Sequence, residues 1–157
     1  MLGPDHPETL TTRADLTFRR GQVGDPAGAV IATAELLADR LRVLGPDHPD
    51  TLTTRHNLAH WRGEAGDAAG AAAAAAELLA DSLRVLGPDH PATLLARHNL
   101  ARWWGEAGDA VGAVTAFAEL LADSLRVLGP DHPATLVTRY YLAHWRGQAD
   151  GASGGVR

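Results

Sequence analysis

The string LGPDHP occurs four times at a constant spacing, and this repetition limits what the chain can fold into. The copies at residues 44–85 and 86–127 differ at 9 of 42 positions, and residues 2–43 differ from 44–85 at 13. Near-identical units of this length predict a tandem array in which each unit packs against its neighbours. We therefore expect one array over residues 1–147, with units 2–43, 44–85 and 86–127 and a partial unit 128–147.

Each unit divides into two helical segments, called helix A and helix B here. In the second unit, Gly45 and Pro46 end a helix, because glycine accepts a left-handed backbone and proline cannot continue a helix. Helix A starts near Pro49, and Gly66 followed by the N-cap Asp67 separates it from helix B. Apolar residues have helical spacing, and no segment alternates like a strand. We expect an all-α, tandem helix-turn-helix solenoid of about seven helices, with A helices at about 7–22, 49–65, 91–107 and 133–147 and B helices at about 26–43, 68–85 and 110–127.

The last ten residues differ in composition from the repeats. Residues 148–157 read QADGASGGVR, which is polar and rich in glycine. A segment of this kind offers little apolar surface to pack, so we expect a flexible tail.

The composition excludes several classes of chemistry and partner. The chain has no cysteine, and all of its 14 basic residues are arginine, which excludes disulfides, thiolate metal sites and lysine Schiff bases. A net charge of −5 with interspersed signs gives no field for binding nucleic acid or an anionic membrane. Because no signal peptide or membrane-spanning stretch is recognisable, we expect a cytoplasmic protein.

The repeat resembles a known family. Asn57-Leu58-Ala59, the break at Gly66, Ala71 and the region of Leu78 are similar to the tetratricopeptide repeat in the 42-residue form found in kinesin light chains, as is LGPDHP followed by Thr-Leu. The resemblance covers residues 2–147 and implies a right-handed superhelix that binds proteins without catalysis. The sequence departs from the family pattern at Arg62, where an aromatic residue is expected, and only Phe117 supplies the expected aromatic residue of helix B.

Aspartate and histidine stand side by side before every A helix, a pairing that could suggest acid–base catalysis. We favour a structural interpretation, in which the histidine caps the helix next to a proline and the aspartate suits the helix dipole. Four pairs that are each one repeat apart do not form the single convergent cluster that a catalytic site needs. The pairs are Asp5-His6, Asp47-His48, Asp89-His90 and Asp131-His132.

Two histidines in the second unit have the spacing of zinc ligands. His56 and His60 are four residues apart, but no HExxH glutamate lies between them and the sequence assigns no third ligand. The three serines, Ser82, Ser124 and Ser153, lie in no nucleophile motif. We therefore expect no enzyme activity, no native metal site and no cofactor.

The A helices carry the candidate binding residues. The resemblance implies that these helices line a concave groove and that Asn57 and Asn99 hold the main chain of an extended peptide, since a carboxamide both donates and accepts hydrogen bonds. Neighbouring histidines, arginine and tyrosines favour an acidic or C-terminal-carboxylate ligand, with binding that strengthens below about pH 6.5. The alternative is a solvated polar face without a ligand. The predicted peptide-binding residues are His56, Asn57, His60, His98, Asn99, Arg102, Tyr140, Tyr141 and His144.

The two ends of the array differ. In the first unit, Arg19 replaces the tryptophan found at positions 61, 103 and 145, which suits a polar terminal cap. The last A helix has no B helix after it, so its apolar outer face either closes the array, pairs with another copy or continues into a longer array. Self-assembly into a homo-oligomer is therefore the alternative function. The predicted oligomer face consists of Leu136, Val137, Leu142 and Trp145.

Arginines on the A helices and acidic residues on the B helices recur at fixed positions. Because this repetition does not vary between units, we expect ion pairs between helices rather than ligand contacts, each of small energy where exposed. The arginines are Arg13, Arg55, Arg97 and Arg139, and the acidic residues are Glu35, Glu77, Glu119, Asp39, Asp81 and Asp123.

Overall fold

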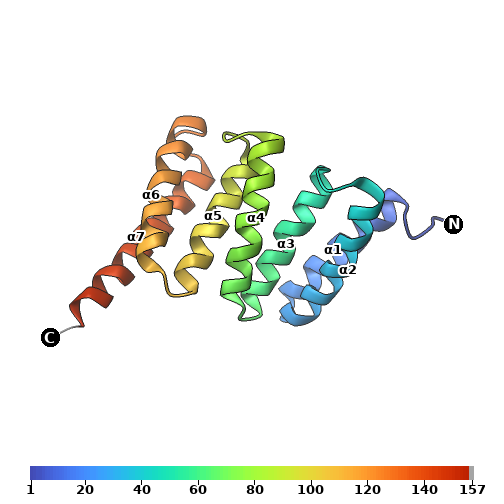
Figure 1. The fold of residues 1–157 in the computed structure, drawn as a ribbon, viewed down its shortest axis with the longest axis horizontal. Helices are drawn as coiled ribbons and strands as arrows, with labels where there is room; N and C mark the ends of the chain where they lie inside the picture. The colour runs from blue at the N-terminus through green and yellow to red at the C-terminus, as the bar shows by residue number, and fades with distance from the viewer. Residues whose placement is uncertain (156–157) are drawn as a thin grey trace. The chain divides into compact units, whose positions relative to one another are not determined.

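The computed structural model describes residues 1–155, and within them the chain forms seven α-helices and no strand (Figure 1). The all-α fold of tandem helical pairs is thereby confirmed, and the first six helices end within two residues of the expected limits. The A helices are α1 (Pro7–Gln22), α3 (Pro49–Glu64), α5 (Pro91–Glu106) and α7 (Pro133–Gly154), and the B helices are α2 (Pro26–Leu44), α4 (Ala68–Leu86) and α6 (Ala110–Val127).

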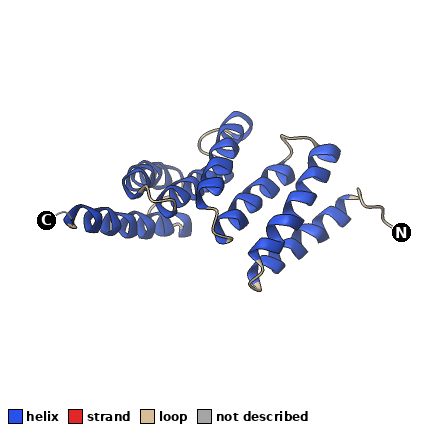
Figure 2. Cartoon of the chain, turned by 60° about the horizontal axis from the view of Figure 1, so that its bottom comes forward, coloured by secondary structure: helices blue, strands red, loops and turns tan. Residues whose placement is uncertain are grey.

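The helices belong to two compact units, Met1–Ala74 and Ala75–Arg157. The first contains α1, α2, α3 and the start of α4, and the second contains the rest of α4 with α5, α6 and α7. Within each unit a B helix packs against the A helices before and after it, and those two A helices also touch (Figure 2). Each unit therefore has the layered packing of a helical repeat.

Side-chain caps begin the helices where the sequence places them. Asp25 and Asp109 accept hydrogen bonds from the N–H groups of Gly28 and Gly112, at 2.9 and 2.8 Å. The A helices are capped differently, because a histidine Nδ1 accepts from the N–H two residues later, at 3.2 Å for His6 and 3.1 Å for His48, His90 and His132. An imidazole nitrogen thus replaces the usual hydroxyl or carboxylate oxygen as the N-cap.

Tryptophan rings set the distance between neighbouring A helices. A Cβ atom at Gly21 would collide with the ring of Trp61, and a Cβ atom at Gly105 would collide with the ring of Trp145. Both rings are buried, and Trp145 joins a core that includes Leu94, Ala101, Phe117, Leu120 and Leu142. Only glycine allows an indole ring to approach the helix backbone this closely.

The last helix is longer than the sequence predicted. We expected a flexible tail from residue 148, but α7 continues to Gly154, and the side chain of Ser153 donates to the carbonyl oxygen of Ala149 at 3.1 Å. No proline or positive-φ glycine interrupts this segment, so the helix hydrogen bonds propagate through it. Residues 156 and 157, also part of the predicted tail, lie outside the described residues.

The expected ion pairs between helices are present in both units. Arg13 donates to Asp39 and Arg97 donates to Asp123, each at 2.7 Å. Hydrogen bonds from Arg13 and Arg42 lower the pKa of Asp39 below its usual value. Arg42 and Arg126 also bind the aspartates before the A helices, Asp5 and Asp89, at 2.6 Å. The repeated arginines and aspartates therefore join helix A to helix B.

The approach of tryptophan to glycine predicts opposite effects of the same substitution at equivalent positions. Gly105→Ala should lower the free energy of unfolding by about 1–3 kcal/mol, because the added methyl group displaces the Trp145 ring. Gly147→Ala, with open space beside it, should be neutral or raise that energy by about 0.5–1 kcal/mol through helix propensity. Urea unfolding followed by circular dichroism measures both. Equal effects of the two substitutions would show that the tryptophan contact does not limit residue 105.

Candidate functional site

The second unit brings six of the nine predicted peptide-binding residues together on two touching A helices. His98, Asn99 and Arg102 lie on α5, and Tyr140, Tyr141 and His144 lie on α7. A ring contact joins the two groups, because the rings of His98 and Tyr141 meet edge to face with their centroids 4.9 Å apart. The predicted residues on these helices therefore form one group of side chains.

Phe117 on α6 is the floor of this group. Its ring is fully buried, lies nearly parallel to the ring of Tyr141 at 5.5 Å, and meets the edge of His98 at 5.1 Å. At the equivalent B-helix positions the other units have Thr33 and Ala75, so this arrangement is specific to the third unit. The aromatic contacts fix the orientations of His98 and Tyr141.

Above this floor lie side chains that reach the surface. Tyr140 is 66% exposed, and its ring is nearly parallel to that of His144 at a centroid distance of 6.4 Å. The guanidinium carbon of Arg102 lies 4.3 Å from the centroid of the Trp103 ring, within the range of a cation–π interaction. The surface thus offers an exposed phenol and an arginine whose guanidinium group is held against a ring.

The other three predicted residues lie on α3 of the first unit, where the structure corrects the expected role of His56. Burial and the nearby His60 lower the pKa of His56 to about 4, so this imidazole is neutral at physiological pH and does not become charged just below pH 6.5. The ring of His60 contacts the edge of Trp61 at 4.7 Å, and Asn57 is half-buried between the two histidines in sequence. A positive charge from His56 is therefore not available to a ligand at neutral pH.

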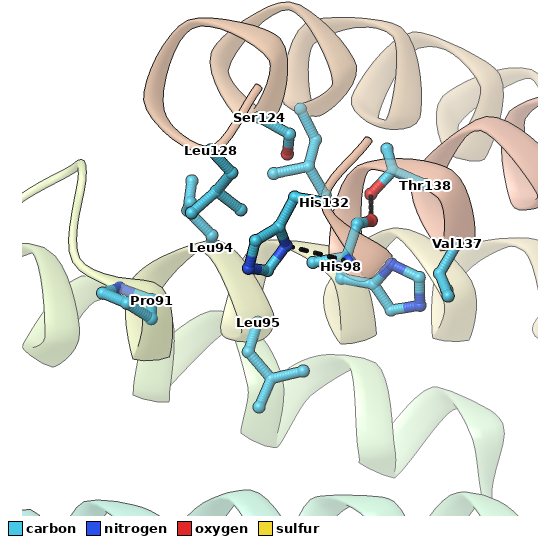
Figure 3. A pocket seen from close by; sticks show the side chains of 11 residues that line it. Pro91, Leu94, Leu95, His98, Ser124, Leu128, His132, Val137 and Thr138 are labelled. Atoms are coloured by element: carbon cyan, nitrogen blue, oxygen red, sulfur yellow. Dashed lines mark hydrogen bonds between the residues drawn. The ribbon is translucent and has the colours of Figure 1, made fainter. Parts of the chain in front are cut away.

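The structure also contains a cavity that the sequence analysis missed. It measures about 310 Å³ and lies among the first turns of α5 and α7 and the end of α6 (Figure 3). Comparing positions 42 or 84 residues apart could have indicated it, because Ser124 stands where the first unit has the much larger Arg40. The lining residues are Pro91, Leu94, Leu95, His98, Leu120, Ser124, Leu128, His132, Ala134, Val137 and Thr138.

The predicted oligomer face is divided by the structure. Leu142 and Trp145 are only 5% and 6% exposed, because they pack into the core formed with α5 and α6, and they are not part of an outer surface. Leu136 and Val137 are 49% and 45% exposed. The sequence could not separate these residues because a helix that is apolar on two faces does not reveal which face its neighbours cover.

The Asp–His pairs have the structural role that we favoured. The histidines cap the A helices, and Asp5 and Asp89 pair with arginines of the following B helices. Within residues 1–155, no three acidic or histidine side chains are placed to hold a metal ion. None of the described helices is long and apolar enough to cross a bilayer.

A sequence profile of the tetratricopeptide repeat matches residues 9–50, 51–92 and 93–134. The chain belongs to the tetratricopeptide repeat family. The profile has the 42-residue period found in the sequence, with repeats that begin seven residues later than the units defined above. This family is generally one of non-catalytic scaffolds, so the match supports a protein-interaction scaffold.

Solved structures share this tetratricopeptide fold. A Podosopora anserina kinesin light chain with nearly identical TPR-like repeats is 25% identical, with a TM-score of 0.78, and the match covers 98% of this chain and 74% of that one. A second crystal structure with the same description gives a TM-score of 0.76 at the same identity and coverage. BtubC (BKLC) from P. vanneervenii shares the fold at 19% identity and a TM-score of 0.75, over 90% of this chain and 56% of that one. No curated protein matches the chain with significant similarity.

The lowered pKa of His56 predicts an acid-sensitive fold. Between pH 6.5 and 4 the unfolded chain binds a proton at this residue that the folded chain does not, so stability should fall as the pH falls through this window. His56→Gln should remove about 2 kcal/mol of the loss between pH 7 and pH 5. Urea titrations of both proteins at these two values test this. The same pH dependence in the variant would show that His56 is protonated in the folded protein at pH 5.

Proposed function

We propose that this tetratricopeptide chain is a non-catalytic scaffold that binds an extended peptide segment on the face of its A helices. The observation that carries the proposal is the group formed by Arg102, Tyr140, Tyr141 and His144 in the second unit. Tyrosine and arginine are the residue types that most often dominate binding energy at protein interfaces. Rings that already contact one another lose little entropy when a ligand arrives.

The ligand that fits this group best is an acidic segment. Arg102 has five N–H donors in a planar fork that matches a carboxylate, and its contact with Trp103 limits the positions of the guanidinium group. Because His56 is neutral, attraction to an acidic ligand at neutral pH rests mainly on Arg102. Asn57 and Asn99 complete the proposal as residues for the ligand main chain, since their amides can donate and accept.

The test is to select binders from a displayed library of random linear peptides and to measure their affinities by fluorescence anisotropy. Tyr140→Ala combined with Arg102→Gln should weaken the selected peptides roughly tenfold or more, because both hot-spot side chains are lost. Val111→Ala is the matched control, an exposed apolar residue on α6. Affinity should also fall as salt rises if the ligand is acidic. A library without binders, or affinities that the double variant leaves unchanged, would refute the proposal.

A second candidate function is self-assembly of two copies through α7, and one observation favours it. Leu136 is 49% exposed, whereas the equivalent Leu10, Leu52 and Leu94 are 1–5% exposed. Arg139 stands at the position where Arg13 and Arg97 pair with the following B helix, and it has no ion pair among residues 1–155. This side of α7 therefore keeps the side chains with which other A helices bind a neighbour.

Sedimentation velocity over a wide concentration range tests self-assembly. If α7 joins two copies, Leu136→Glu should convert a dimer into a monomer, because it places a charge in an apolar contact. Thr11→Glu is the control, an exposed position one turn from the buried Leu10. A monomer at every concentration of the unmodified chain would exclude this function.

A further inference from the structure

The cavity in the second unit has walls that are almost entirely aliphatic. Leu94, Leu120 and Leu128 line it, with Leu95 and Val137 about half exposed at its rim (Figure 3). Two histidines also line it. The Nδ1 atom of His132 accepts from the N–H of Ala134, and the ring of His98 lies against Phe117 and Tyr141. None of the lining residues is acidic, so the cavity offers no counter-charge to a cation.

The first unit fills the equivalent register with a side chain of its own. Arg40, 84 residues before Ser124, is 4% exposed. Its Nη1 atom donates to the carbonyl oxygen of Asp50 at 3.0 Å and to Oγ1 of Thr54 at 2.7 Å. Ala134 and Thr138 stand at the equivalent positions of the second unit, where Thr138 Oγ1 already donates to the carbonyl oxygen of Ala134 at 2.8 Å. The backbone arrangement that holds Arg40 is therefore kept in the second unit, while serine leaves the space open.

Three further differences between the units make the second one less polar at this place. Leu95 replaces Thr11, Val137 replaces Thr53, and Ala134 replaces Asp50. The last change removes a carboxylate that lies 4.0 Å from Arg40 in the first unit. An arginine entering from a partner would thus lose the charge that accompanies Arg40, and its burial would be unfavourable. All of these differences favour a neutral, apolar occupant.

We propose that this cavity is an anchor pocket for one aliphatic side chain, leucine or methionine, of a bound peptide. The inference rests on the proposed function, because the pocket lies between the same two helices, α5 and α7, that carry Arg102 and Tyr140. The extended stem of Arg40 in the first unit shows that a long, narrow side chain suits this register. A cavity of about 310 Å³ with apolar walls gives water few hydrogen-bond partners, so an aliphatic group that displaces it gains affinity.

The first arm of the test uses small amides and does not require a peptide ligand. N-acetyl-leucinamide and N-acetyl-methioninamide are titrated into the protein while methyl signals are followed by NMR. The signals of Leu95, Val137 and Thr138 should shift and saturate, and N-acetyl-argininamide should shift them at least tenfold more weakly. Equal responses to all three amides would overturn an aliphatic preference.

The second arm uses the peptides selected from the library. Replacing their aliphatic residue with alanine should weaken binding roughly 10- to 100-fold, the effect of losing one buried aliphatic side chain. Ser124→Arg places in the pocket the side chain that the first unit has there, and on this variant the alanine replacement should cost less than threefold. Ser153→Arg is the matched control, because it adds the same charge at an exposed position of α7.

A variant at the rim keeps the test decisive if Ser124→Arg does not fold. Leu95→Thr with Val137→Thr copies the rim residues of the first unit at two exposed positions and should weaken the selected peptides roughly tenfold. Peptides that need Tyr140 and Arg102 but bind all pocket variants equally would overturn the pocket and leave the proposed function in place. Saturation by the leucine amide without any peptide binder would overturn both the proposed function and the peptide as occupant.

Discussion

The contact between an indole ring and a bare helix backbone fixes the geometry of both units. Trp61 lies against Gly21 and Trp145 lies against Gly105, so each A helix is held close to the one before it. The intervening B helix packs against both. With this spacing set, the ring of Tyr141 on α7 reaches those of His98 on α5 and Phe117 on α6, and the candidate site is a direct result of the helix packing.

A repeated scaffold allows chemistry to change while the backbone stays the same. Arg40 and Ser124 occupy one register, with the same threonine and carbonyl group beside them, yet one side chain fills a space that the other leaves open. Phe117 is a second example, since it adds an aromatic floor at a position held by threonine and alanine in the other units. Functional differences between repeats therefore arise from side-chain volume and polarity, and the helices need not move.

The electrostatic character of the chain divides between structure and recognition. The arginines that pair with aspartates join helix A to helix B, and the cap histidines use Nδ1 as an acceptor at the start of each A helix. Burial keeps His56 neutral, while Arg102 lies against a tryptophan ring. Of the charged and titratable groups on the A helices, only some are therefore suited to attract a ligand.

The sequence by itself determined the period, the helix limits, the caps and the ion pairs between helices, because glycine, proline and N-cap signals act within a few residues. It also indicated which A-helix positions gather on α5 and α7, since a fixed period brings equivalent positions onto adjacent helices. Only the tertiary structure decided that Trp145 and Leu142 are buried, that His56 is neutral, that α7 extends to Gly154 and that Ser124 leaves a cavity. Three of these, the burial, the neutral histidine and the cavity, depend on how much of each side chain the neighbouring helices cover, which is a sum over distant residues that no local pattern records.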